Sequence, residues 1–433
     1  MDNYIMTARI CEEEFHGFVK KITAGMGKIE TKFCAQMIAG INKSASVILT
    51  NIARNSIKGV SVKKSAERLS RHLNSFDSGR MWGNYCGEVG NLFGENPLYI
   101  VDDTEAVKPL SERMEGLDWV RDGSDNDKLK PGYSVNEIVA INKKGQPVSV
   151  SSKLYTATEQ EFESANTIRC EAVKEVVKNN GSGTFVCDRG FDDVKFFNFL
   201  SKIHQKYIIR CKSNRNVIDN GKAINIYEAA KGLKGKYSFS IKFQSGKKEN
   251  LKASYIQVQL PKMSAPLTLV AAFGFHNDED EPFFLLTNHT VQDKDSCLNV
   301  IRAYLSRWKI EEYFKFKKQA YGFEAMRLLK LAALKNLNTF LTVVLGFMAT
   351  LSLSSICKKI IQLSEPIKAK AAFIYYRLYN GFHTFLHCFK SDLLLFIYPK
   401  KPKPPQPQQR DLFHYLRYQK NRQNLRQFQN GGF

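Results

Sequence analysis

The sequence is short of acidic residues and lacks the motifs that mark several common enzyme classes. Only 42 of its 433 residues are Asp or Glu, against 64 Lys and Arg, which gives a formal net charge of +22. It has no Walker A loop, GxGxxG turn, HExxH helix or GxSxG elbow, which argues against P-loop, dinucleotide-binding, zincin and serine-hydrolase chemistry. The nine cysteines form no CxxC pair and the eight histidines show no ligand spacing, so we expect no zinc site and a reducing compartment.

The excess of positive charge is typical of a protein that binds a polyanion, most often nucleic acid; an anionic membrane surface is the alternative. Residues 331–433 carry fifteen basic and three acidic residues, a net charge of +12. The N-terminus has no cationic stretch followed by an apolar one, so we expect a cytoplasmic protein. The uncharged run 336–357 contains Asn, Thr, Ser and Gly, which favours a buried core helix over a membrane span. No membrane partner is therefore expected.

Hydrophobic periodicity divides the chain into four regions. Residues 1–95 are predicted to be helical, with a basic helix that begins at Ser61 and suits DNA binding as well as a solvated face. Residues 96–328 give the order strand, hairpin of two strands, helix, strand, helix, strand, with strand-like runs from about 213 to 289 before a late helix. Residues 329–396 are predicted to be helical, and 397–433 to be a Pro/Lys-rich linker and basic tail. The order predicts an α/β fold, a ribonuclease-H-like mixed sheet with a β-rich insertion.

Acidic residues stand where these predicted elements would bring them together. Asp102 and Asp103 end the first strand, Asp188 ends the fourth, and Glu311 lies on the late helix. Carboxylates a few Å apart repel one another, and Mg²⁺, which prefers a few hard oxygens, would relieve that repulsion. Two such ions about 4 Å apart can activate an attacking oxygen and stabilise a leaving one in phosphoryl transfer.

Each aspartate also has a structural explanation. Asp at a strand-to-helix junction is often only an N-cap, and Asp192 or Asp193 is expected to cap the helix after CDRG. Asp103, before Thr104, could be a turn former. The joint placement of the three acidic positions favours the catalytic interpretation.

The stretch YLSRWKIEEYFKFKKQ, residues 304–319, is predicted to be a single helix with a polar face. Tyr304, Arg307, Glu311 and Lys318 fall within a wedge of roughly 60° on a helical wheel. A solvated face with ion pairs is the alternative to a functional surface.

The spacing Y-x2-R-x3-E-x6-K resembles the YREK signature of bacterial and archaeal insertion-sequence transposases of the DDE superfamily. VDDT and FVCDRGFDD resemble the two acidic regions of that group, and the resemblance spans roughly Tyr99 to Met326. It implies that Asp102, Asp188 and Glu311 are catalytic ligands of Mg²⁺, for which Mn²⁺ can substitute. Asp103 stays open as an alternative first ligand.

The resemblance also implies a substrate and its contacts. Tyr304, Arg307 and Lys318 would hold phosphates of the transposon end, and Phe283 would stack on a base flipped out beside the cut. Since neighbouring strand residues face opposite ways, we expect either Phe283 or Phe284 to lie on a less buried face. The implied activity is binding of inverted-repeat DNA ends, cleavage and strand transfer, in a homodimer associated with the nucleoid. A metal-dependent nuclease without strand transfer and a transposase-derived DNA-binding protein are the alternatives.

Overall fold

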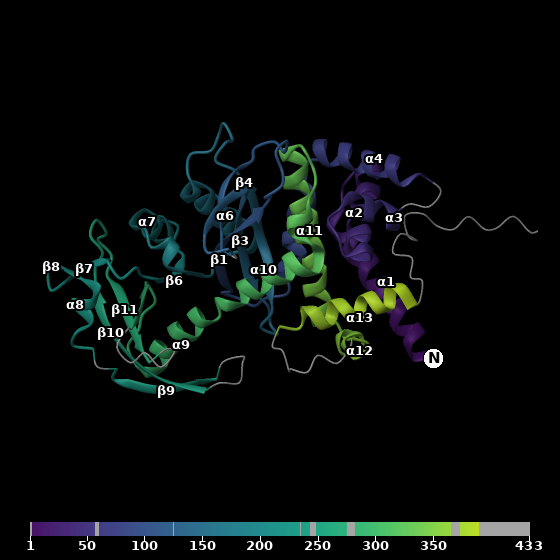
Figure 1. The fold of residues 1–433 in the computed structure, drawn as a ribbon. Coiled ribbons are helices and arrows are strands. Elements are labelled where there is room, and N and C mark those ends of the chain that lie inside the picture. The colour runs from purple at the N-terminus through teal and green to yellow at the C-terminus, as the bar shows by residue number, and fades with distance from the viewer. Residues whose placement is uncertain are drawn as a thin grey trace, which may run out of the picture. The chain divides into compact units, whose positions relative to one another are not determined.

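A sheet of ten strands runs through the described part of the chain (Figure 1). The computed structural model describes residues 2–56, 60–123, 125–233, 235–242, 248–274, 282–364 and 373–388. The strand order is β2-β3-β1-β5-β6-β12-β11-β10-β9, and β4 pairs with β3. The strands are β1 (Leu98–Val107), β2 (Asp118–Asp122), β3 (Lys128–Ile141), β4 (Pro147–Tyr155), β5 (Thr184–Cys187), β6 (Lys206–Arg210), β9 (Tyr237–Lys242), β10 (Lys248–Val258), β11 (Leu267–Phe273) and β12 (Phe283–Thr287).

The centre of the sheet has the mixed strand directions that the sequence predicts. β3 is antiparallel to both β1 and β4, whereas β1, β5 and β6 are parallel to one another. This confirms the predicted α/β fold class, with helical regions before and after the sheet. The division into four domains stays a prediction, and the linker and tail, 397–433, lie outside the described residues.

The predicted insertion contributes strands to this same sheet. β12 pairs antiparallel with β6, and β11, β10 and β9 follow in antiparallel order. The four strand-like runs of the insertion are all strands, as predicted. The sequence did not predict β2, nor a two-stranded hairpin and short helix: β7 (Asn216–Asp219), β8 (Lys222–Asn225) and α8 (Ile226–Ala230).

Helices cover the sheet and form the region before it. The N-terminal helices are α1 (Asp2–Ile22), α2 (Lys28–Ser44), α3 (Leu49–Ser56), α4 (Val62–Ser75) and α5 (Gly79–Gly90). The later ones are α6 (Ala165–Asn180), α7 (Val194–Lys202), α9 (Lys294–Leu305), α10 (Trp308–Tyr321), α11 (Leu331–Leu353), α12 (Cys357–Gln362) and α13 (Tyr375–Cys388). The hydroxyl of Ser61 accepts the N–H of Lys64 and caps α4, as the sequence predicts.

α11 is a largely buried helix (Figure 1). It contacts β4 of the sheet and also α2, α4 and α5 of the N-terminal region. Among the described helices it alone is long and apolar enough to cross a membrane, but 83% of its most apolar window is buried inside the protein. It is therefore the buried core helix that the sequence predicts.

Two predicted elements have different bounds in the structure. The single helix expected over residues 304–319 is wrong, because α9 ends at Leu305 and α10 begins at Trp308. The first strand does not end at the aspartates, since β1 stays paired with β3 as far as Val107. The pairing of β1 with β5 stops earlier, at Val101, and leaves Asp102 beyond the end of that ladder.

Candidate active site

Asp102 and Asp188 are brought together by the register of two parallel strands. Val101 of β1 is opposite Cys187, the last residue of β5, so the next residue on each strand is an aspartate. Beyond this point β5 turns into a short 3₁₀ turn, Arg189–Phe191, and Asp188 caps it by accepting the N–H of Gly190 at 2.8 Å. A Cβ at Gly190 would lie 3.0 Å from the Asp188 carboxylate, so glycine permits this close turn. The sequence prediction that these two carboxylates share one edge agrees with this placement.

Arg307 lies between Asp102 and Glu311. Its guanidinium donates to Asp102 Oδ2 at 3.1 Å and to Glu311 Oε1 at 2.6 Å. The Asp102 and Arg307 side chains are mostly buried, whereas the Glu311 side chain is 41% exposed. The break between α9 and α10 places Arg307 at the first turn of α10, one turn before Glu311. The predicted DNA-binding arginine therefore holds two of the three predicted metal ligands in this structure.

The carboxylates match a divalent cation in chemistry, although they do not converge on a single point. Burial, and then repulsion from Asp188, raises the pKa of the Asp102 carboxyl to about 7, while Arg307 opposes the rise. Within the described residues, no three His, Cys, Asp or Glu side chains lie close enough together to hold a metal ion. Asp102 and Asp188 thus fit a cation as an adjacent pair of hard oxygen donors. Glu311 is linked to that pair through Arg307.

Asp103 is engaged elsewhere. Its Oδ2 accepts from Arg169 Nε at 3.0 Å and also from Arg169 Nη2, while its Oδ1 accepts from Asn136 Nδ2 at 2.7 Å. Arg169 belongs to α6 and also stacks over the ring of Phe191. Successive residues of a strand point to opposite faces. The structure therefore places Asp102 toward α10 and Asp103 toward α6.

A cleft of about 940 Å³ opens beside Asp188. Its described lining contains four cations and Asp188 as its single carboxylate; the cations are Arg189, Arg210, Lys212 and Arg307. Trp308 also lines it and is 56% exposed, an unusual position for a large aromatic side chain. The sequence predicted Arg307 but not the other three cations or Trp308. Trp308 had a usable signal, since it directly follows Arg307 within the Y-x2-R-x3-E-x6-K spacing.

The two phenylalanines before α9 are both buried, so the expectation that one lies on a less buried face is wrong. Phe283 is 8% exposed and stacks on Tyr304, with ring centroids 5.7 Å apart. Phe284 is 2% exposed and meets the edge of Tyr227, on α8. They face opposite ways, as strand geometry requires, but helices cover both faces. Both rings also border the cleft.

Tyr304 and Lys318 lie on either side of the Arg307–Glu311 pair. Burial raises the pKa of the Tyr304 phenol, and Arg210 and Arg307 beside it oppose the rise. Lys318 pairs with Glu324 at 3.0 Å on a partly exposed surface. Of the four predicted helix-face residues, Arg307 contacts both Glu311 and Tyr304, whereas Lys318 forms its ion pair elsewhere.

Asp192 and Asp193 have the structural roles that their position allows. Asp193 caps α7 by accepting the N–H of Lys195 at 2.8 Å. Asp192 is buried and pairs with Arg215 at 2.6 Å. Neither joins Asp188 at the site.

Comparison with known proteins identifies a protein family that the chain matches. A family model described as "Transposase DDE domain" matches residues 94–347, more than half of the chain. The match begins just before β1 and ends within α11, so it includes every carboxylate described above. A similar solved structure is the cryo-EM structure of a piggyBac transposase synaptic complex with hairpin DNA. It has 12% identity and a TM-score of 0.41, and the similarity covers 92% of this chain and 77% of that one. No curated protein matches the chain.

Proposed function

Because the chain belongs to the DDE transposase family, we propose that it binds the inverted-repeat ends of a mobile element, cleaves them and transfers the freed strands to target DNA. The observation that carries the proposal is the β1–β5 register, which puts Asp102 next to Asp188, and Asp188 lines a cationic, aromatic cleft. A homodimer would hold the two ends together. The bacterial or archaeal nucleoid is the proposed setting.

The proposed metal site consists of Asp102, Asp188 and Glu311. Asp102 and Asp188 would hold Mg²⁺, or Mn²⁺ in its place, and Glu311 would join them once Arg307 turns away from the carboxylates, with or without DNA. When bound, the cation supplies stabilisation of the negative charge on the reacting phosphoryl group. Burial, and then repulsion from Asp188, raises the pKa of Asp102; the repulsion supports this assignment, because a cation would relieve it.

The remaining residues would bind and orient the DNA. Arg307 can grip a phosphate with two parallel donors, and Lys318 supplies a point charge farther along α10. Phe283 is the proposed platform for a flipped base, which requires its stack on Tyr304 to open. The exposed Trp308 offers a second platform at the same cleft without any rearrangement.

A cleavage and joining assay tests the proposal. The substrate is the DNA that flanks the gene of this protein, incubated with Mg²⁺ and a target duplex. Glu311→Gln and Asp188→Asn should abolish cleavage while end binding stays within a few fold, because each keeps the shape of the side chain and removes its charge. Asp193→Asn is the matched control: it makes the same chemical change at an N-cap that does not join the site, and it should keep cleavage.

The products distinguish the alternatives. Cleaved ends that never join the target would identify a nuclease without strand transfer. Binding without cleavage by the wild-type chain would identify a DNA-binding protein. If Glu311→Gln cuts at a substantial fraction of the wild-type rate, the assigned site is wrong.

A further inference from the structure

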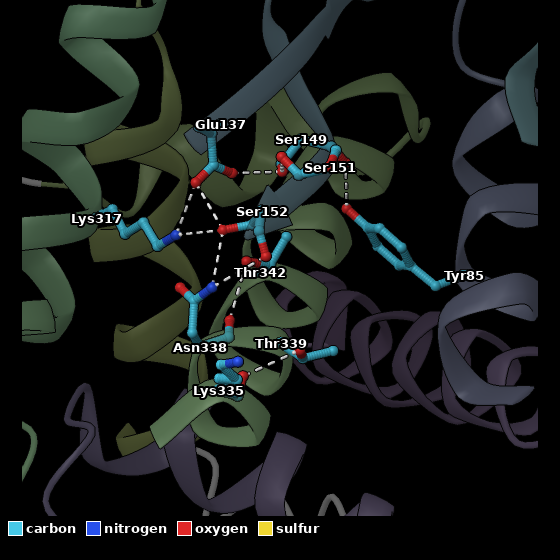
Figure 2. Close-up of polar contacts among 10 residues, drawn as sticks. All are labelled: Tyr85, Glu137, Ser149, Ser151, Ser152, Lys317, Lys335, Asn338, Thr339 and Thr342. Atoms are coloured by element: carbon cyan, nitrogen blue, oxygen red, sulfur yellow. Dashed lines mark hydrogen bonds and ion pairs between the residues drawn. The ribbon is translucent and has the colours of Figure 1, made fainter. Parts of the chain in front are cut away.

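A buried ion pair ties the helix that carries Glu311 to the centre of the sheet. Lys317 of α10 donates from Nζ to Glu137 Oε2 of β3 at 2.9 Å. Their side chains are 1% and 0% exposed. Figure 2 shows the pair inside a group of polar side chains from β3, β4, α10 and α11. A lysine and a glutamate that are both fully buried are rare in proteins.

The pair is surrounded by directional hydrogen bonds. Glu137 Oε1 accepts from Ser149 Oγ at 2.5 Å, and its Oε2 accepts from Ser152 Oγ at 2.8 Å. Lys317 Nζ also lies 3.1 Å from Ser152 Oγ, which accepts from Asn338 Nδ2 at 2.9 Å (Figure 2). Burial lowers the pKa of Lys317, and Glu137 opposes that change. Both charges are therefore hydrogen-bonded although no solvent reaches them.

Stability alone does not account for such a pair. Replacing a buried ion pair with apolar groups of the same volume is often neutral or stabilising, because desolvation offsets the attraction. The pair does, however, fix the position of α10 relative to β3. The Lys317 ammonium finds its acceptors at one place above β3, and a slip of α10 by one residue would move it about 1.5 Å along the axis and rotate it by about 100°.

Fixing α10 in this way also fixes the position of Glu311 relative to Asp102, two of the proposed metal ligands. In the β1–β3 ladder, Glu137 lies directly opposite Asp102, so the two side chains leave the same face of the sheet as neighbours. On α10, Glu311 comes six residues before Lys317, about 9 Å along the axis. Because α10 is a continuous helix, fixing the position of Lys317 along and around the helix axis over β3 also fixes the position of Glu311 over β1.

We propose that Glu137 and Lys317 are positioning residues: their buried pair sets the axial and rotational position of α10 over β1 and thereby holds Glu311 within reach of the cation site at Asp102 and Asp188. This inference rests on the proposed function for the identity of that site. Neither residue touches substrate or cation, and both act through Glu311.

The test is direct Mn²⁺ binding to the full-length protein without DNA, measured by the loss of the free-ion electron paramagnetic resonance signal. The double variant Glu137→Gln, Lys317→Met keeps both shapes and removes both charges. We expect its Mn²⁺ affinity to fall about tenfold or more, as for other residues that orient metal ligands. Its melting temperature should stay within about 5 °C of the wild type, since removing both charges together leaves neither one buried without its partner.

A matched control removes buried hydrogen bonds at a different place on α11. Asn336 donates to the carbonyls of Leu73 and Phe76 at 2.8 Å each, which connects α11 to the α4 region and not to α10. Asn336→Ala should lower the melting temperature while Mn²⁺ affinity stays within about twofold, because additive behaviour is expected of sites that share no partner. Should the double variant fail to fold, Glu137→Asp takes its place. It keeps the charge, shortens the arm by one methylene, and should also weaken Mn²⁺ binding.

Each outcome has a defined meaning. A folded double variant, or a folded Glu137→Asp, with wild-type Mn²⁺ affinity overturns the inference, and so does an equal loss of affinity in Asn336→Ala. Wild-type protein that binds Mn²⁺ but never cuts DNA overturns the proposed function and leaves the positioning role standing. Wild-type protein that binds no Mn²⁺ overturns both.

Discussion

The two adjacent aspartates of β1 should respond in opposite ways to the same substitution. Asp103 and Arg169 form an ion pair with side chains only 23% and 17% exposed, so Asp103→Asn leaves a mostly buried guanidinium without its charge partner. Breaking a fully buried pair costs about 3–5 kcal/mol, and the residual exposure here reduces our expectation to about 2 kcal/mol. For a protein of 433 residues that corresponds to a fall of about 2 °C in melting temperature. Mn²⁺ affinity should stay within about twofold, because Asp103 faces away from the site.

Asp102→Asn should do the reverse. It removes a carboxylate that burial and Asp188 disfavour by more than Arg307 stabilises it, so the metal-free protein should melt no lower than the wild type. Its Mn²⁺ affinity should fall at least about tenfold, since a ligand is lost. Differential scanning fluorimetry and Mn²⁺ titration of both variants make the comparison. Loss of Mn²⁺ binding in Asp103→Asn with retention in Asp102→Asn would refute the assignment and make Asp103 the first ligand.

Three further predictions concern DNA contacts and pH. Arg307→Ala and Lys318→Ala should each lower the slope of log K against log salt for end binding by about one, and unchanged slopes in both would return them to a solvated, ion-paired face. A fluorescent base analogue beside the cleaved end should brighten on binding to the wild type and stay quenched with Phe283→Ala, whereas Phe284→Ala should mainly lower stability; a bright signal with folded Phe283→Ala contradicts the platform role. Burial lowers the pKa of the Lys108 amine from 10.5 to about 8, so between these values the unfolded state binds more protons and the free energy of unfolding rises with pH. From pH 8 to 10 the melting temperature of the wild type should therefore rise relative to that of Lys108→Met, and parallel curves would show that Lys108 does not titrate in this range.

The sequence predicted the carboxylate pair because each aspartate has a local signal. Asp102 and Asp188 each follow a short apolar run, and the ladder between the parallel strands β1 and β5 stops one residue before both of them, although β1 itself continues to Val107. The helix carrying Glu311 was also predictable from periodicity. Its start was not, because nothing in the run of residues around Arg307 shows that the guanidinium will turn toward Asp102 and that the helix will begin again there.

The local sequence pattern could not show which distant residues each predicted element would contact. The sequence shows that Phe283 and Phe284 face opposite ways, but only the tertiary structure shows that Tyr304 and Tyr227 cover both faces. Likewise, the runs of the insertion are evident as strands, whereas their pairing onto β6 depends on contacts distant in sequence. Glu137, within a predicted hairpin strand, carried no signal of a buried partner 180 residues away.

The packing of α11 limits which parts of this protein can be removed or exchanged as separate units. Phe340 on this helix packs against the rings of Phe33 and Phe76 from the N-terminal region, and the ring of Tyr85 lies so close to Gly346 that a Cβ there would be 2.3 Å away. The same helix also packs on β4. We therefore expect that the first 95 residues cannot be removed without loss of stability. A catalytic fragment that lacks them would expose part of the apolar helix α11 to water. A chimera that exchanges these residues between two such proteins would have to carry the matching side of α11 with them.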